Sequence, residues 1–232
     1  MPFRKMYKRK RPNRPGRARK RRFRRRAIGP SAVVSSTSPV PDQFFTKLKY
    51  TEYLQFNTAT GVTPYLYNMG GLYDPNHSGA GHQPFGFDQL AALYERYRVY
   101  GVKYHILIQN TSGTYPVDVA VVLKPVTTLS TDMQTIAEKP YTQVRSLGVT
   151  SNAKCQYLFK GYVDNPKLLG VSKERYRVDD QYSALKTANP VLSPYLHMYW
   201  REVAGTTGIT LNFKVHLTYY CKFFQRVPLT GS

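Results

Sequence analysis

The sequence has few acidic residues and few cysteines. Thirteen Asp and Glu stand against 34 Lys and Arg in 232 residues, and the formal net charge is +21. A surplus of this size favours polyanionic partners. Cys155 and Cys221 have neither CxxC spacing nor the spacing of a disulfide framework, so a reducing compartment is the default expectation. A single disulfide between these two cysteines is compatible with the sequence.

Long apolar runs are also missing. No stretch approaches the roughly 18 consecutive apolar residues of a membrane helix. The charged N-terminus is not followed by an apolar segment, which argues against a secretory signal. We therefore expect no membrane insertion.

Motifs for catalysis and for metal or cofactor binding are absent as well. The sequence contains no GxSxG, no HExxH and no cysteine in a nucleophile context, and the Gly-rich stretch 70–86 lacks the GK[ST] of a phosphate-binding loop. Asp74, His77 and His82 share that stretch, but loop histidines without supporting ligands are more often exposed than metal-bound. The chain is predicted to be no enzyme and to need no metal or cofactor.

Positive charge is abundant, and it is concentrated at the N-terminus. Residues 1–26 hold fifteen Lys or Arg and no acid, and the first acidic residue is Asp42. Subtracting these fifteen from 34 leaves nineteen basic against thirteen acidic residues, a net of +6, for residues 27–232. Residues 1–26 have few large apolar side chains and strong internal repulsion, so we expect this arm to be disordered without a partner.

The arm is predicted to bind nucleic acid. Lys and Arg at this density neutralise phosphates, and the counterions released make binding salt-dependent and independent of sequence. Phe23 stands between two arginines, where its ring can stack on an unpaired base. Fifteen charges exceed the roughly five to eight of a nuclear import signal, yet import by host receptors is a compatible second role. The predicted residues for both roles are Arg4, Lys5, Lys8, Arg9, Lys10, Arg11, Arg14, Arg17, Arg19, Lys20, Arg21, Arg22, Phe23, Arg24, Arg25 and Arg26.

Two further zones follow the arm. Residues 27–42, "AIGPSAVVSSTSPVPD", are small, Ser- and Pro-containing and uncharged until the last position, which is typical of a flexible linker. Residues 43–232 are rich in Tyr, Val, Leu and Phe, and their number suits one all-β domain with a sizeable core.

The domain is dominated by alternation of apolar and polar residues. In "ITLNFKVHLTYYCKFF" the odd positions from Ile209 to Phe223 are apolar, whereas Lys214, His216 and Lys222 share the other face. Period two over this length indicates a strand with one buried face. Further strands are expected at 44–56, 101–109, 117–124, 155–163 and 195–203, with weaker signals at 141–149 and 175–183. His105 and His216 alternate with apolar residues, which places both at a surface or interface.

One short helix is expected at residues 88–97. Leu90, Leu93, Tyr94 and Tyr97 recur at helical spacing, and Asp88 is placed to cap the start. Residues 67–87 and 164–194 are expected to be long loops. About eight strands, one helix and long loops predict an all-β antiparallel sandwich.

Tyrosine is unusually frequent. The chain has twenty tyrosines, and the segment 94–104 mixes them with arginine. Tyr suits protein–protein contacts because its ring is apolar and its hydroxyl polar, but it also has a high strand propensity. The sequence supports both interpretations equally.

The order of these parts resembles the coat proteins of circovirus-like viruses, which have circular single-stranded DNA genomes. The resemblance rests on "RKRRFRRR" in the arm, "YERYRVYGVKYHILI" as an early strand, and "NFKVHLTYYCKFFQ" as the last long strand. It implies an eight-stranded antiparallel jelly roll, an icosahedral shell of identical subunits, and an arm that faces packaged single-stranded DNA and carries nuclear import. The virion, and the host nucleus during assembly, are the implied locations.

Some features depart from that family or fit others. Arms in the family often run longer and contain Trp, whereas this one ends at Arg26 and has none. Coat proteins of small RNA viruses share the arm and the jelly roll. A ribosomal protein, whose charge is usually spread over the folded part, and a non-structural nuclear shuttle protein are the alternatives outside the coat proteins.

Overall fold

A computed structural model describes residues 40–58, 61–79, 81–151, 154–203 and 208–228. The predicted arm, 1–26, and all but the last three residues of the predicted linker lie outside these ranges. The strands are β1 (Gln43–Asn57), β2 (Thr63–Asn68), β3 (Tyr94–Asn110), β4 (Val117–Lys124), β5 (Thr142–Leu147), β6 (Gln156–Asp164), β7 (Ala184–Leu185), β8 (Tyr195–Glu202) and β9 (Thr210–Arg226). The helices are α1 (Phe87–Ala91), α2 (Met133–Ala137), α3 (Asn165–Leu168), α4 (Lys173–Val178) and the short 3-10 helix η2 (Asp180–Tyr182).

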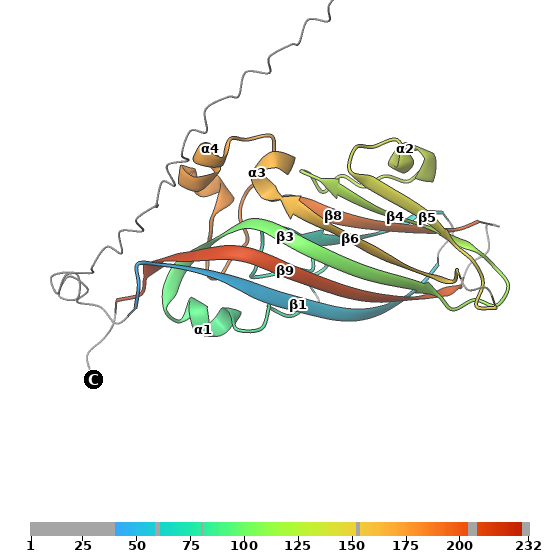
Figure 1. Cartoon of the computed structure of the whole chain (residues 1–232), viewed down its shortest axis with the longest axis horizontal. Helices are drawn as coiled ribbons and strands as arrows, with labels where there is room; N and C mark the ends of the chain where they lie inside the picture. Colours follow the sequence, from blue (N-terminus) through green and yellow to red (C-terminus); the bar gives the residue numbers. More distant parts are fainter. Residues whose placement is uncertain (1–39, 59–60, 80, 152–153, 204–207, 229–232) are drawn as a thin grey trace, which may run out of the picture. The chain divides into compact units, whose positions relative to one another are not determined.

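The strands form two facing antiparallel sheets (Figure 1). The first has the order β1-β9-β3-β6, with the two-residue β7 paired to β3, and the second has the order β2-β8-β4-β5. Without β7, these are eight strands in the order of a jelly roll. The predicted all-β jelly-roll sandwich is confirmed. No helix within the described ranges is long and apolar enough to span a membrane.

The core lies between the two sheets and follows the alternation of β9. All odd positions from Leu211 to Phe223 are buried, and the even positions are partly or fully exposed. Phe213 is 1% exposed, and its ring lies 4.9 Å from Trp200 of the second sheet and 5.4 Å from Phe56, measured between centroids. The predicted face assignment of β9 is therefore confirmed, and large aromatic side chains fill the space between the sheets.

The outer face of the second sheet is covered by the chain itself. Ala120, Val122 and Tyr199 are buried there against Met133 and Ile136 of α2. The helix starts at Asp132, whose carboxylate accepts hydrogen bonds from the backbone and the hydroxyl of Thr135 at 2.8 and 2.9 Å. The residues of the second sheet that point outward thus form a small second core.

The helix predicted at 88–97 is mostly wrong. The observed α1 ends at Ala91, and its N-cap is Gly86 with φ of 88°, so Asp88 lies in the first turn instead of capping it. Tyr94 and Tyr97 belong to β3 and are paired with Arg226 and Phe223 of β9. The helical spacing of these residues does not decide their conformation, because pairing with β9 buries both rings.

The segments between strands are more ordered than predicted. The prediction of a strand at 175–183 is wrong, because these residues form the end of α4 and η2. The predicted loop 164–194 also contains α3 and β7. Ser172 caps α4 by accepting a hydrogen bond from the Arg175 backbone at 3.1 Å. The strand β2 extends into the predicted loop 67–87. The expected single helix is thus replaced by four short α-helices within the described residues.

Candidate nucleic-acid interface

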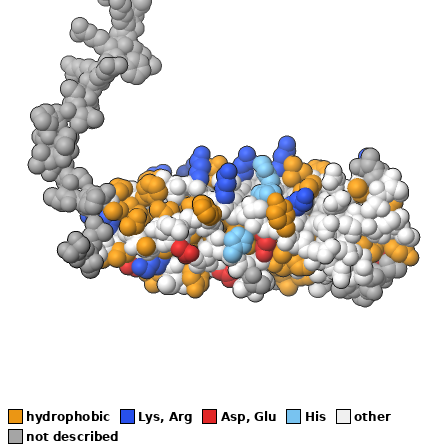
Figure 2. Space-filling model, turned by 90° about the horizontal axis from the view of Figure 1, so that it is seen from below, with side chains coloured by type: hydrophobic (Ala, Val, Ile, Leu, Met, Phe, Trp, Pro, Cys, Tyr) orange, Lys and Arg blue, Asp and Glu red, His pale blue; other side chains and the backbone are white. Residues whose placement is uncertain are grey.

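The outer face of the first sheet is open and rich in lysine. Positions that point away from the core carry six lysines and two histidines, drawn from all four long strands. Figure 2 shows Lys and Arg side chains projecting along one side of the molecule, with His beside them. We call this surface the basic sheet face, and it consists of Lys47, Lys49, Lys103, His105, Lys160, Lys214, His216 and Lys222.

Strand register places these side chains in rows across the sheet. One row contains Lys49, Thr218 and Lys103, and the next contains Thr51, His216, His105 and Lys160. Neighbouring rows on one face of a sheet are two residues, roughly 7 Å, apart. The cationic groups are therefore spaced regularly over a continuous surface.

Acidic residues are nearly absent from this surface. Among the outward positions of β1, β9, β3 and β6, Asp164 at the end of β6 is the only carboxylate. Glu52 points inward instead, where its carboxylate accepts hydrogen bonds from the hydroxyls of Tyr50 and Tyr67 at 2.8 and 2.7 Å. Burial, followed by this contact with Glu52, raises the pKa of both tyrosines. The lysines thus keep a net charge available to an anionic partner.

Exposed aromatic rings lie among the lysines. The side chains of Phe45 and Tyr53 are 65% and 68% exposed. The Lys222 ammonium lies 5.7 Å from the Phe45 centroid, and the Lys47 ammonium lies 5.2 Å from the Tyr220 centroid. Phe45 and Tyr100 stack at 6.2 Å beside an apolar hollow of about 220 Å³. Rings interleaved with cations are the arrangement that binds single-stranded nucleic acid, because unpaired bases stack while phosphates meet the cations.

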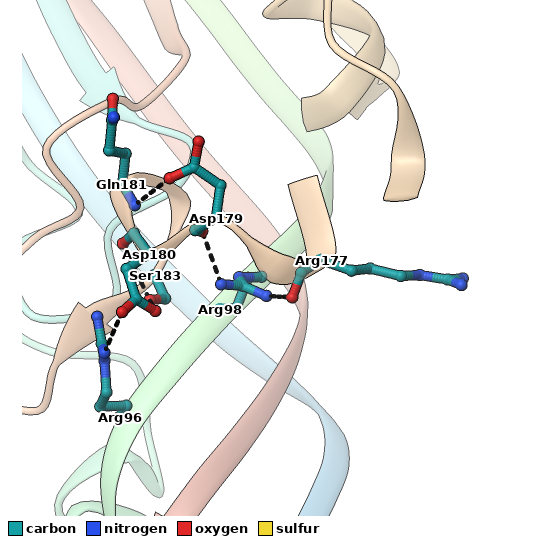
Figure 3. A network of polar contacts seen from close by, with 7 residues as sticks. All are labelled: Arg96, Arg98, Arg177, Asp179, Asp180, Gln181 and Ser183. Atoms are coloured by element: carbon teal, nitrogen blue, oxygen red, sulfur yellow. Dashed lines mark hydrogen bonds and ion pairs between the residues drawn. The ribbon is translucent and has the colours of Figure 1, made fainter. Parts of the chain in front are cut away.

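A network of arginines extends this surface at one end (Figure 3). The buried Arg98 guanidinium donates to the carbonyl oxygen of Arg177 and, at 2.8 Å, to that of Asp179. Arg96 forms an ion pair with Asp180 at 3.1 Å. Together these contacts hold α4 and η2 against β3. In Figure 3 the Arg177 side chain points away from Arg98.

The extended end carries side chains of both charges. The exposed side chains of Lys173 and Arg177 line a hollow of about 220 Å³ together with Tyr100, Tyr162 and the carboxylate-bearing Asp164. The pKa of Lys222 lies below its usual value because of partial burial and because of repulsion from Arg98 and Arg177.

The two histidines of the face are direct neighbours. His105 of β3 is paired in register with His216 of β9, and the Nδ1 atom of His216 lies 3.1 Å from the Thr51 hydroxyl. The pKa of His105 is lowered by burial and then by Lys103, His216 and Lys160. The prediction that both histidines lie at the surface agrees with this arrangement.

Other candidate residues from the sequence do not gather at this face. His82 stacks on Tyr50 at 4.6 Å, and His77 contacts the Tyr195 ring at 5.4 Å. Within the described ranges no three His, Cys, Asp or Glu side chains form a group suited to a metal ion. Cys155 and Cys221 are both free thiols, so the bridge that the sequence left open is not formed.

The tyrosines of segment 94–104 are mainly structural. Tyr97 is fully buried, and its hydroxyl donates to the Ala188 carbonyl at 2.8 Å while it accepts from the Leu72 backbone at 3.1 Å. Tyr104 is 3% exposed and accepts a hydrogen bond from Gln143. Packing and loop anchoring, in addition to strand propensity, account for these residues.

The predicted binding residues of the arm, Arg4 to Arg26 including Phe23, lie outside the described residues. The lysines of β1, β3 and β6 on the basic sheet face were missed from the sequence. Their signal is present in "FFTKLKY", "GVKYH" and "YLFKG", where each lysine stands on the polar side of an alternating strand. Counting the charged residues on the polar side of each predicted strand would have identified these lysines.

Comparison with known proteins identifies no family but finds similar structures. No protein-family model and no curated protein matches the sequence. The chain is similar to the empty head of turnip yellow mosaic virus, with 13% identity over 86% of this chain and 90% of that chain and a TM-score of 0.45. It is similar to decameric BFDV capsid protein, with 12% identity over 78% and 99% and a TM-score of 0.43. A semi-empty VLP of Macrobrachium rosenbergii nodavirus gives 12% identity over 85% and 100% and a TM-score of 0.46.

Matches at these identities and TM-scores do not establish a family. The jelly roll is established by the strand order of the chain itself. The circovirus-like resemblance stays a prediction.

Proposed function

We propose that the chain is the coat protein of a small circovirus-like virus, whose identical subunits assemble into an icosahedral shell around single-stranded DNA. The observation that carries the proposal is one jelly roll with a lysine-rich, acid-poor open face, preceded in sequence by an arm of fifteen basic residues. The arm precedes β1, an edge strand of the sheet that bears the basic sheet face. We infer that the arm and the basic sheet face serve one nucleic-acid-binding function.

The charge of the arm has the right magnitude for packaging. Sixty subunits, the smallest icosahedral shell, would bring about 900 arm charges, as fifteen on each subunit. A genome of about 2,000 nucleotides carries one charge per phosphate, so the arms would neutralise roughly half of it. The basic sheet face and counterions would supply part of the remainder.

Exposed apolar side chains supply surfaces for contact between identical subunits. Phe85, Val178 and Val191 are 93%, 79% and 81% exposed. The Phe85 backbone nitrogen donates to the carbonyl of Lys49, so this ring is displayed from an anchored backbone. Large apolar groups at fixed positions favour association because their burial removes them from water.

Deleting residues 1–26 tests the nucleic-acid part of the proposal. Binding of an oligothymidylate should weaken strongly, and the slope of log K against log salt should fall by about 0.7 for each phosphate that the arm no longer neutralises. The truncated chain should keep the melting temperature of the full chain. An unchanged salt slope would exclude the arm from binding.

Nuclease digestion tests which nucleic acid is packaged. DNase should digest the nucleic acid that copurifies with the full chain. Digestion by RNase alone would indicate that the chain packages RNA.

Nuclear import through the arm is tested separately. A neutral reporter fused to residues 1–26 should accumulate in the nucleus of a host cell, because import receptors recognise clustered Lys and Arg. Even distribution of the fusion between nucleus and cytoplasm would refute this part and leave the packaging role in place. The same fusion with its basic residues changed to Gln is the control.

A further inference from the structure

A cationic hollow lies near the middle of the basic sheet face. Its volume is about 280 Å³, and it is open to solvent between β1, β9 and β3. The side chains that line it and point outward are Lys49, Thr51, Lys103, His105, His216 and Thr218. The hollow thus combines two ammonium groups, two imidazoles and two hydroxyls.

Strand register explains why these groups converge. Lys49 and Lys103 flank Thr218 in one row, because β9 lies between β1 and β3. His216 and His105 are neighbours in the next row, with Thr51 on one side and Lys160 on the other. Each strand contributes alternate residues only, so all of these side chains lie on the same face of the sheet.

The lysines of the hollow are not neutralised within the described part of the chain. Neither Lys49 nor Lys103 takes part in any of the ion pairs found there, and the same holds for Lys160, which lies beside the hollow on β6. The nearest outward carboxylate on these strands is Asp164, four residues beyond Lys160 along β6. A hollow lined by donors and cations, without a carboxylate, is complementary to an oxyanion.

We propose that this hollow binds backbone phosphates of single-stranded nucleic acid between the ammonium groups of Lys49 and Lys103, with the imidazoles of His105 and His216 as hydrogen-bond donors. The inference deepens the proposed function and depends on it, since it places individual phosphates on the basic sheet face. A protonated imidazole donates from both ring nitrogens, whereas a neutral one donates from a single nitrogen.

The surroundings of His105 make binding dependent on pH. His105 is approached by Lys103 on its own strand, by Lys160 on β6 and by His216 on β9, while Lys49 and Thr51 of β1 complete the hollow. Burial, and then repulsion from the neighbouring cationic side chains, lowers the pKa of His105, so its proton is disfavoured in the empty hollow. A bound phosphate supplies the missing negative charge and favours protonation, so by linkage affinity rises as the pH falls.

Binding of a labelled oligothymidylate to the full chain at fixed salt tests this inference. Phosphodiesters and the Lys and Arg of the arm do not titrate between about pH 7.5 and 5.5, so the arm contributes a constant affinity. The wild-type chain should bind roughly tenfold more tightly at the lower pH. The double variant His105→Gln/His216→Gln should lose that gain and keep the affinity seen at the higher pH. The control His77→Gln/His82→Gln should behave as the wild type.

The lysines are tested by the salt dependence of the same binding. Lys49→Gln/Lys103→Gln should lower the slope of log K against log salt by about 1.4, since each phosphate bound on a single strand contributes about 0.7. The control Arg145→Gln/Arg201→Gln, on the second sheet, removes two charges and should leave the slope unchanged. Equal melting temperatures of all variants show that folding is intact.

The outcomes separate this inference from the proposed function. Failure of the wild-type chain to bind at either pH would overturn both. Tight binding with the same gain at low pH in the His105→Gln/His216→Gln variant would overturn the hollow alone. Heparin, a sulfated glycan, can be compared with nucleic acid of equal charge as a competitor for the bound oligothymidylate. If heparin competes more strongly, and if this advantage is lost in the Lys49→Gln/Lys103→Gln variant, the hollow binds a different polyanion and the inference is likewise overturned.

Discussion

Phe213 of β9 and Trp200 of β8 join the two sheets, with their ring centroids 4.9 Å apart. Both side chains are 1% exposed. Because Phe213 belongs to the first sheet and Trp200 to the second, their contact lies in the middle of the sandwich. The adjacent Lys214 points to the opposite side and is exposed.

Changing Phe213 to Ala should lower the free energy of unfolding by about 3–5 kcal/mol, because the cavity left between the sheets cannot fully collapse. Lys214→Ala removes no core volume and should stay within about 0.5 kcal/mol of the wild type. Chemical denaturation of both variants measures the difference. A larger loss of stability for Lys214→Ala would mean that the faces of β9 are inverted.

Arg98→Met should loosen α4 and η2. The substitution leaves two carbonyl oxygens, those of Arg177 and Asp179, without their guanidinium donor, at a local cost of about 2–3 kcal/mol. Trypsin should then cleave after Arg175 and Arg177 much faster than in the wild-type chain.

Arg96→Met is the matched control for that experiment. It breaks the ion pair with Asp180, whose side chain is 71% exposed, and such pairs contribute at most about 1 kcal/mol. Trypsin cleavage should change little. Equal cleavage rates in the two variants would show that Arg98 does not hold this segment.

The sheets were predictable from the sequence because their signal is local. The alternation in β9 holds from Thr210 to Phe224, because one face of the strand is buried. β2 was not predictable in this way. It has six residues, contains Pro64, and is mostly half-buried along its length, so apolar and polar positions do not alternate. Its pairing with β8 decides its conformation.

The candidate site was only partly predictable. Each lysine of the basic sheet face can be assigned to the polar side of its own strand, but the meeting of His105 with His216 depends on the register between β3 and β9. These residues are separated by more than a hundred positions, and the bulge between Val99 and Gly101 shifts the register. Local sequence patterns reveal neither the pairing of these two strands nor the position of the bulge.

Phe85→Ala should reduce particle yield without destabilising the subunit, because the ring is 93% exposed and makes its contacts with a neighbouring subunit under the proposed function. Phe87→Ala is the contrasting variant. Phe87 is 1% exposed and packs against Tyr97 and Phe223, so its loss should lower the melting temperature. Unchanged particle yield for Phe85→Ala would remove Phe85 from the subunit contacts.

His197 should make the subunit sensitive to acid. The side chain is fully buried between Val126 and Tyr199, with its Nε2 atom 2.9 Å from the Val126 carbonyl. Burial lowers the pKa of His197 to about 4, whereas an unfolded chain has a value near 6.5. The folded state therefore binds fewer protons than the unfolded state between these values, and stability falls as the pH drops through this window.

The size of this effect is up to about 3 kcal/mol, present in full above about pH 6.5 and lost by about pH 4. The variant His197→Gln should show a smaller loss of stability over this range than the wild type, whatever its stability at neutral pH. Thermal melts at several pH values measure this difference. The control His82→Gln should lose as much stability in acid as the wild type does. Identical pH profiles for His197→Gln and the wild type would contradict the assignment.

Electron microscopy of the purified full-length chain, before and after removal of its nucleic acid at high salt, tests the coat-protein function most directly. A coat protein should form closed round particles of uniform diameter that contain nuclease-protected nucleic acid. Monomers or dimers at every salt and nucleic-acid concentration, or binding of nucleic acid without any closed particle, would contradict it and favour a nuclear shuttle protein.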